Sequence, residues 1–271
     1  MNLFERFVYW LQGTMETPVP YGWFHLMWIA LVIIAIIILY KIKDKYNDRQ
    51  LKTVLLVYGI IAFVLEALKQ ISWAFNFDPI TNLVTWDYEW YAFPFQLCTT
   101  PIFVSLICAF LKEGKVRTSL LSYMAFVTIL GSLATIIIPD SCFVSDILVN
   151  IHTMWLHCGS LVVSVYLLMT SIKINKKNLI NSLIVFLVFV GLALFFNILV
   201  YNIGVLNGET FNMFYISPYF ISSLPVFDVL QETFPYLIYL VMYISIISLG
   251  AIIVYYISYF IKNILSRKTI F

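Results

Sequence analysis

A thiol and an imidazole stand at matched depths in two apolar segments of this chain. Cys98 lies near the start of the apolar run 93–111, and His157 lies within the run 149–172. If both runs are helices, a rise of about 1.5 Å per residue places Cys98 roughly 8 Å and His157 roughly 12 Å below the same end of a bundle. A neighbouring histidine can accept the proton of a thiol and later return it to a leaving group. The spacing therefore indicates a nucleophilic cysteine–histidine pair.

A structural interpretation of the same two residues stays open. A free cysteine is common in apolar interiors as a small apolar side chain, and a buried histidine often only hydrogen-bonds to neighbouring groups. The four cysteines form no CxxC pair and no metal-finger spacing, so we expect neither a disulfide framework, nor a metal site, nor a cofactor. From spacing alone, the pair is a candidate for catalysis or for packing.

Further polar side chains in the apolar runs could surround the thiol. A charge at mid-helix costs about 2.5–3.5 kcal/mol to insert, so each one needs an explanation. Glu66 and Lys69 stand three residues apart on one helix face, where they can form an ion pair. Lys69 and Asn197 fall roughly 9 Å below the same end as Cys98. The candidate donors to an oxyanion are Gln96, Thr99 and Asn197. Asp140 or Glu66 could orient the imidazole, and Lys69 and Tyr236 complete the expected cavity.

The elements that position these residues must be membrane-spanning helices. Hydrophobic residues make up 62% of the 271 positions and charged residues only 11%, far below the roughly one quarter charged that soluble domains carry. The basic residues occur in small groups between apolar runs, which argues against a nucleic-acid surface. We expect an all-α, polytopic bundle in which residues 1–271 form one membrane domain. Seven runs can each cross about 30 Å of hydrocarbon, near 23–41, 52–75, 93–111, 118–138, 149–172, 179–203 and 234–261.

The distribution of lysine and arginine predicts an orientation. Cytoplasmic loops of membrane proteins carry an excess of these residues. All 16 except Arg6 and Lys69 fall at one end of the seven expected spans. The four groups are Lys41, Lys43, Lys45, Arg49 and Lys52; Lys112, Lys115 and Arg117; Lys173, Lys176 and Lys177; and Lys262, Arg267 and Lys268. We therefore expect the N-terminus outside and the C-terminus in the cytoplasm.

The first 22 residues have a different character from a cleavable signal. They carry Glu5, Arg6 and Glu16 in place of a basic leader region. Apolar residues recur at helical spacing from Leu3 to Leu11, which predicts a short helix lying in the outer membrane interface. A disordered tail is the alternative. The longer outer connections, 76–92 and 204–233, are rich in aromatic residues that suit the same interface.

Several short motifs together resemble one family. Phe-Pro-Phe-Gln-Leu-Cys at 93–98 resembles the Leu-Pro-Leu-His-Leu-Cys signature of the YwaF family of bacterial integral membrane proteins. The other pieces occur in that family's order over most of residues 60–240. They are Glu66 to Lys69; Gly131 with Ile-Pro-Asp at 138–140; His157; Asn202 to Asn212; Ser217-Pro218; and Pro235-Tyr236.

The resemblance implies a function. The YwaF family is similar to eukaryotic membrane acyltransferases that move fatty acyl chains between phospholipids through a cysteine acyl intermediate. By that likeness Cys98 would accept the acyl group, His157 would act as base and acid, and the substrate would be a membrane phospholipid. The chain departs from the pattern at Gln96, Ile138 and Ser217, where the family has His, Thr and Lys. The expected location is the cytoplasmic membrane of a bacterium.

Three function classes remain on the sequence alone. The first is a lipid acyltransferase, or a thioesterase or lipase in which water replaces the acceptor. The second is a transporter or a small-solute or lipid-binding protein that uses the polar cavity without catalysis, since the Glu66–Lys69 pair could bind a zwitterion or relay protons. The third is a receptor or assembly factor with a structural polar core. The last apolar run has no lysine at mid-membrane for a retinal Schiff base.

Overall fold

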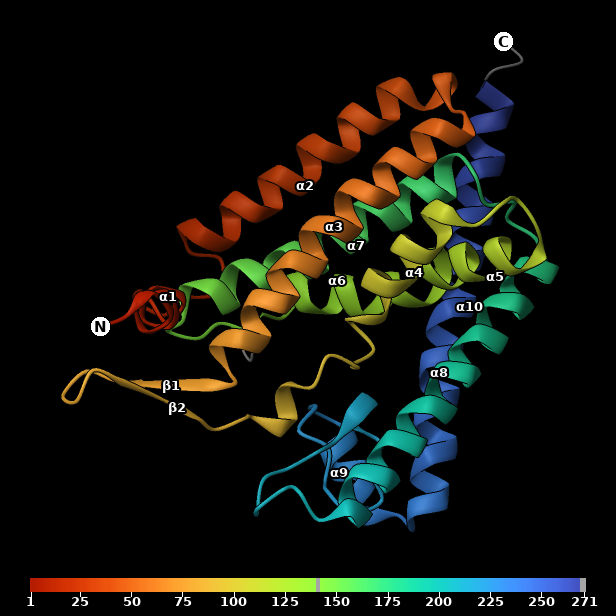
Figure 1. Cartoon of the computed structure of the whole chain (residues 1–271). Helices are drawn as coiled ribbons and strands as arrows, with labels where there is room; N and C mark the ends of the chain where they lie inside the picture. The colour runs from red at the N-terminus through yellow and green to blue at the C-terminus, as the bar shows by residue number, and fades with distance from the viewer. Residues whose placement is uncertain (140–141, 269–271) are drawn as a thin grey trace.

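The protein is a polytopic bundle of membrane helices (Figure 1). The computed structural model describes residues 1–139 and 142–268. In chain order the elements are α1 (Leu3–Leu11), α2 (Trp23–Ile42), η1 (Lys43–Lys45), α3 (Asp48–Ser72), β1 (Phe75–Asp78), β2 (Leu83–Trp86), η2 (Trp90–Ala92), α4 (Thr100–Phe110), α5 (Lys115–Tyr123), η3 (Met124–Thr128), α6 (Ile129–Ile137), α7 (Ile147–Met169), α8 (Lys176–Ile203), η4 (Met213–Tyr215), α9 (Phe227–Thr233) and α10 (Tyr236–Lys268).

Six helical stretches of the described chain are long and apolar enough to cross a membrane. They are Trp23–Lys45, Asp48–Ser72, Lys115–Ile137, Ile147–Met169, Lys176–Ile203 and Tyr236–Ile264. Each coincides with one of the expected spans. The third contains a π-helical turn, η3, which joins α5 to α6 and packs on α7. The assignment of the N-terminus to the outside stays a prediction.

The run 93–111 is helical over only part of its length. Helix α4 covers 11 residues, or about 17 Å, which is too short to cross the hydrocarbon alone. The cause is the proline pair. Pro94 disfavours helical backbone in the residue before it, and Pro101 stands in the first turn of α4, where a proline suits a helix start. The expectation of a continuous helix from residue 93 is therefore wrong.

The non-helical backbone that leads into α4 keeps its polar groups paired. Asp87 N and Glu89 N donate to the carbonyls of Ala74 and Trp73 at 3.1 Å each, which ties the segment to the end of α3. Farther along, Gln96 N donates to Thr99 Oγ1 at 2.9 Å. Irregular backbone at membrane depth is tolerated where it is buried in protein and hydrogen-bonded. The part that meets the condition of burial runs from residue 92 to residue 99, which are half-buried or buried, whereas Asp87 and Tyr91 are exposed.

The short N-terminal helix forms where the apolar spacing predicts it. Asn2 caps α1, and its side chain and that of Glu5 bond reciprocally to each other's backbone N–H, at 2.9 and 2.5 Å. Val8 and Leu11 are buried, while Phe4 packs edge-on against Phe75 of the hairpin β1–β2. Helix α1, the hairpin and α9 lie toward one side of the bundle, opposite the end of α10 (Figure 1). Placement of α1 in a membrane interface stays a prediction.

Helix α7 lies at the centre of the bundle. It packs against α2, α3 and α6, and Leu156, His157 and Cys158 are among its buried residues. Helix α3 packs closely on α4 because residue 59 is glycine. A Cβ at that position would lie 2.6 Å from Ser105 Oγ and 2.9 Å from Leu106 Cγ. The α3–α4 contact carries the two polar segments that contain Glu66 and Cys98 toward each other.

The substitution Gly59→Val tests this contact. Overpacking of a well-filled interface costs typically 1–3 kcal/mol, so we expect Gly59→Val to lower the midpoint of thermal unfolding in detergent. Gly191→Val in α8 is the matched control, because no neighbouring atom lies within 4 Å of a Cβ built at Gly191. Equal shifts for the two variants would contradict the close approach of α3 and α4.

Candidate functional site

A buried carboxylate on α3 joins three other polar side chains. Glu66 Oε1 lies 2.8 Å from Lys69 Nζ, and Gln70 Nε2 donates to the same oxygen at 2.8 Å. Glu66 Oε2 lies 2.7 Å from Nε2 of His152 on α7. The side chains of Glu66 and His152 are each 5% exposed, so the cluster lies away from solvent and both carboxylate oxygens have partners. We call Glu66, Lys69, Gln70 and His152 the polar cluster.

The sequence builds the polar cluster through local geometry. Lys69 and Gln70 follow Glu66 by three and four residues, so all three share one face of α3. His152 lies in the second turn of α7, whose start is fixed by two side chains. Asp146 caps the helix by accepting from Val149 N at 3.0 Å, and Asn150 bonds both ways to the backbone of Val144, at 2.7 and 3.0 Å.

The segment before α4 closes over the polar cluster. Tyr88 donates from its hydroxyl to Gln70 Oε1 at 2.7 Å, and Gln70 Nε2 also donates to the Ala92 carbonyl at 2.6 Å. Burial and the nearby Glu66 carboxylate raise the pKa of Tyr88 to about 12. The phenol therefore stays protonated at neutral pH and remains a donor. On the other side, Lys69 Nζ lies 5.6 Å from the centre of the Trp73 ring, within cation–π distance.

Cys98 lies in the turn just before α4, next to the polar cluster. Cys98 is a free cysteine that is half-buried and packs against the main apolar core. Cys98 is within electrostatic range of Lys69 and Glu66. The phenol of Tyr58 on α3 is also within electrostatic range of Cys98. Both the charged cluster and an aromatic hydroxyl group are therefore within electrostatic range of the thiol.

His157 is buried in α7 with its ring nitrogens unpaired. It is 9% exposed and makes no hydrogen bond or ion pair with any residue that the structure describes. His152 lies within electrostatic range of His157. Within the described chain, no hydrogen bond joins His157 to Cys98. The two residues come from different elements, α7 and the turn before α4.

The two expected amide donors hold the loop between α8 and α9. Gln96 Nε2 donates to the Asn212 carbonyl at 3.0 Å, and its Oε1 accepts from Phe214 N at 2.8 Å. Asn197 bonds both ways to the backbone of Met213, at 2.7 and 3.0 Å. Phe214 has φ of +58°, a left-handed conformation that is strained for an aromatic residue. The amide pairs explain how the loop holds this conformation. Because both side-chain amides bond to the loop backbone, they are not free to donate to an oxyanion at Cys98.

The other expected site residues separate into two groups. Thr99 Oγ1 accepts from Gln96 N and donates to the Gln96 carbonyl, both at 2.9 Å, so it stabilises the turn that carries Cys98. Tyr236 donates to the Ile216 carbonyl at 2.7 Å, at the loop between α8 and α9 rather than at the polar cluster. Asp140 lies outside the described residues. Among the described residues, no group of three or more His, Cys, Asp or Glu could hold a metal ion.

Sequence reasoning missed two members of the site. His152 is not among the expected site residues, yet its contact with Glu66 at 2.7 Å is the shortest in the polar cluster. Gln70 is also not among the expected site residues, although it follows Glu66 by four residues, which is the spacing of neighbours on one helix face. That spacing was the available signal for Gln70. For His152 no local signal existed, because its partner comes from a helix about 86 residues away in sequence.

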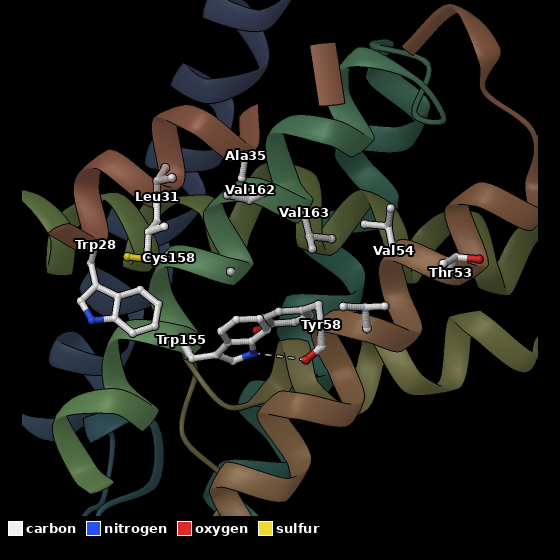
Figure 2. Close-up of a pocket in the computed structure, with 13 residues that line it drawn as sticks. Trp28, Leu31, Ala35, Thr53, Val54, Tyr58, Trp155, Cys158, Val162 and Val163 are labelled. Atoms are coloured by element: carbon white, nitrogen blue, oxygen red, sulfur yellow. Dashed lines mark hydrogen bonds between the residues drawn. The ribbon is translucent and has the colours of Figure 1, made fainter. Parts of the chain in front are cut away.

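An apolar groove runs along α2, α3 and α7 beside the site (Figure 2). Its volume is about 420 Å³, within the range of about 300–1,000 Å³ that small-molecule sites occupy. The walls are Trp28, Leu31, Val32 and Ala35; Thr53, Val54, Val57 and Tyr58; and Trp155, Cys158, Gly159, Val162 and Val163. Trp155 Nε1 donates to the Tyr58 carbonyl at 3.4 Å, so this polar atom is paired inside the protein (Figure 2).

These features define a class of protein: a multi-pass helical membrane protein with a buried polar cluster and an apolar groove among its spans. The chain belongs to the TMEM164 family, whose model matches residues 20–259. The match begins just before α2 and ends within α10, so it covers the polar cluster, Cys98, His157 and the groove. Neither a curated protein nor a solved structure matches the chain.

The substitution Glu66→Gln tests the role of the polar cluster. Removing one partner of a buried ion pair leaves an uncompensated charge and costs about 3–5 kcal/mol. We expect a large drop in the thermal unfolding midpoint in detergent, and partial recovery in the double variant Glu66→Gln/Lys69→Gln. Glu232→Gln, at an exposed position, serves as the control. Unchanged stability of Glu66→Gln would show that the cluster contributes nothing to the fold.

Proposed function

We propose that this protein is a membrane-embedded acyl-transfer enzyme that acts on phospholipid through a thioester at Cys98. The observation that carries the proposal is the setting of the thiol. Cys98 is half-buried at the start of α4, within electrostatic range of Lys69 and of the groove residue Tyr58. A nucleophile beside both a charged cluster and an apolar groove suits a substrate with a polar ester and a hydrocarbon chain.

His157 is the residue that we assign to proton transfer. Its imidazole is buried, and its nitrogens are not used by other described residues, so it is free to accept the thiol proton directly or through one water. A lone unpaired imidazole inside a bundle otherwise lacks a structural reason. Lys69, paired with Glu66 at 2.8 Å, brings positive charge toward the same region, and the Glu66 carboxylate offsets part of its effect on the thiol. The remaining positive charge would favour a developing oxyanion.

The proposed reaction has two steps, formation of an acyl-enzyme and transfer of its acyl group. Cys98 gives its proton to His157, and the thiolate attacks the ester carbonyl of a phospholipid. The C–O bond to glycerol breaks, the lysolipid oxygen takes the proton from His157, and the acyl group remains on Cys98 as a thioester. An alcohol of a second lipid then gives its proton to His157 and attacks the thioester, which restores the thiol. Water in place of that alcohol makes the same site a hydrolase.

The proposal includes a location and a topology. In the proposed arrangement the segment 93–99 together with α4 makes a seventh crossing, the N-terminus lies outside, and the protein resides in the cytoplasmic membrane of a bacterium. The grouping of lysine and arginine supports the orientation. The resemblance of 93–98 to the YwaF signature supports the acyl-transfer chemistry, although that likeness is one of motifs.

A transporter is the second candidate, and the polar cluster is the observation that favours it. Ionisable residues within spans commonly mark substrate or proton pathways. However, Glu66 is already paired with Lys69, Gln70 and His152, so a zwitterion would have to compete with these partners for the carboxylate. Purified protein in vesicles that moves protons or amino compounds across the bilayer would favour this second function.

Intact-protein mass spectrometry tests the enzyme. After incubation of the purified protein with phospholipid, we expect a mass gain of one acyl chain that hydroxylamine removes. Cys98→Ala loses the adduct completely, because the acyl group has no thiol to join. Cys108→Ala retains it and is the matched control, since Cys108 is a buried cysteine within α4 that contacts the Arg117 carbonyl.

His157→Ala separates the two roles in the same assay. Loss of a general base typically costs about 10²–10⁴-fold in rate, so we expect thioester formation slowed by that order, with the fold retained by circular dichroism. A Cys98→Ala protein that still turns over lipid at the wild-type rate would refute the acyl-enzyme mechanism.

A further inference from the structure

We propose that the groove along α2, α3 and α7 holds the hydrocarbon chain of a membrane phospholipid and selects the length of that chain. Chain binding is independent of the chemistry, whereas chain-length selection rests on the proposed acyl transfer. The groove is about 420 Å³ in volume, and all of its walls belong to helices long and apolar enough to span the membrane.

The two ends of the groove differ in chemistry. One end is aromatic, with Trp28, Trp155 and Tyr58, and the other is lined by Ala35, Thr53 and aliphatic side chains (Figure 2). From Trp28 to Ala35 the groove extends seven residues along α2, or roughly 10 Å. One leaflet of hydrocarbon is about 15 Å deep. The groove therefore accommodates a large part of one acyl chain lying parallel to the helices.

The aromatic end of the groove is the end toward the polar cluster. Along α3, Tyr58 lies beyond Thr53 in the direction of Glu66, and the turn with Cys98 leads into α4, which packs on α3. The ring of Tyr58 lies against α7 because residue 159 is glycine, where a Cβ would come 2.7 Å from the ring. Its hydroxyl donates to the Leu156 carbonyl at 3.3 Å. With its polar atoms paired inside the protein, Tyr58 presents an apolar surface to the chain.

The occupant follows from the surroundings of the groove. Leu31, at its mouth, is 47% exposed, and Ile34 and Ile38 on the same helix are 52% and 54% exposed. These side chains face the lipid in a bilayer, so the mouth opens into hydrocarbon. An empty hollow there would lose dispersion contacts on every wall, and lipid chains are the material at hand to fill it. The near absence of polar groups on the walls excludes a headgroup inside.

In this arrangement the groove discriminates between acyl chains by their length. With the ester carbonyl at the aromatic end beside Cys98, the terminal methyl points toward Ala35 and Thr53. A chain that is too long for the groove must bend out of the mouth, and one that is too short leaves the far end empty. Bulk added at Ala35 shortens the groove from its far end without touching Cys98 or His157.

A photoreactive lipid tests the binding. The probe is a phosphatidylcholine with a diazirine near the end of one acyl chain, incorporated with the full-length Cys98→Ala protein in nanodiscs. We expect adducts on the peptides that contain residues 35, 53–54 and 162–163. Ala35→Trp abolishes those adducts, and Ala30→Trp, at a lipid-exposed position of the same helix, retains them. Val57→Trp at the mouth, with Ile60→Trp as its control, gives a second test from α3.

The outcomes distinguish the binding from the chemistry. Adducts in the groove that neither tryptophan variant reduces, adducts only elsewhere, or a protein–protein adduct that shows a second copy in the groove would each overturn the proposal. If the adducts form as expected but Cys98 never carries an acyl group, the lipid site stands and the acyl-transfer function falls. If the thioester forms, we expect Ala35→Trp to shift its acyl chains toward shorter lengths, and an unchanged distribution would refute the length selection.

Discussion

The carboxylate of Glu66 is the charge around which the rest of the site is arranged. Without partners, a buried carboxylate would be prohibitively costly in a membrane span. Lys69 and Gln70 satisfy one oxygen within α3, and His152 on α7 meets the other at 2.7 Å. Because these partners come from two spans, the helices can adopt only one relative register. That register also sets where Tyr58 meets α7, and hence where the groove ends.

A second constraint is the irregular backbone that precedes α4. Pro94 and Pro101 prevent a continuous helix, and the resulting turn presents Cys98 where a straight helix would have enclosed it. The unpaired backbone groups that such a turn creates are satisfied by Thr99 and by the end of α3. Gln96 then links the turn to the loop between α8 and α9 at Phe214. Thiol, turn and loop therefore form one connected unit.

Much of the architecture was predictable from the chain alone. The number of apolar residues between charged groups predicted the six long spans, since about 20 helical residues are needed to cross the hydrocarbon. The spacing from Leu3 to Leu11 revealed α1, and the spacing of Glu66 and Lys69 revealed their ion pair. All of these are local patterns, whose periods are set by helix geometry. The break before α4 is also encoded locally, in Pro94 and Pro101. The prediction of a continuous helix from residue 93 relied on the apolar content of the run instead of on these two prolines.

Contacts between distant segments were decided by the tertiary structure. Sequence depth placed Cys98 and His157 at similar levels, but depth along an axis carries no information on which way a side chain points around its helix. Rotation about each axis is set by packing, such as Gly59 against α4 and Gly159 against Tyr58. The sequence by itself determined the spans, their order and the residues available for chemistry. The tertiary structure alone decided that His152 reaches Glu66 and that three spans leave a groove between them.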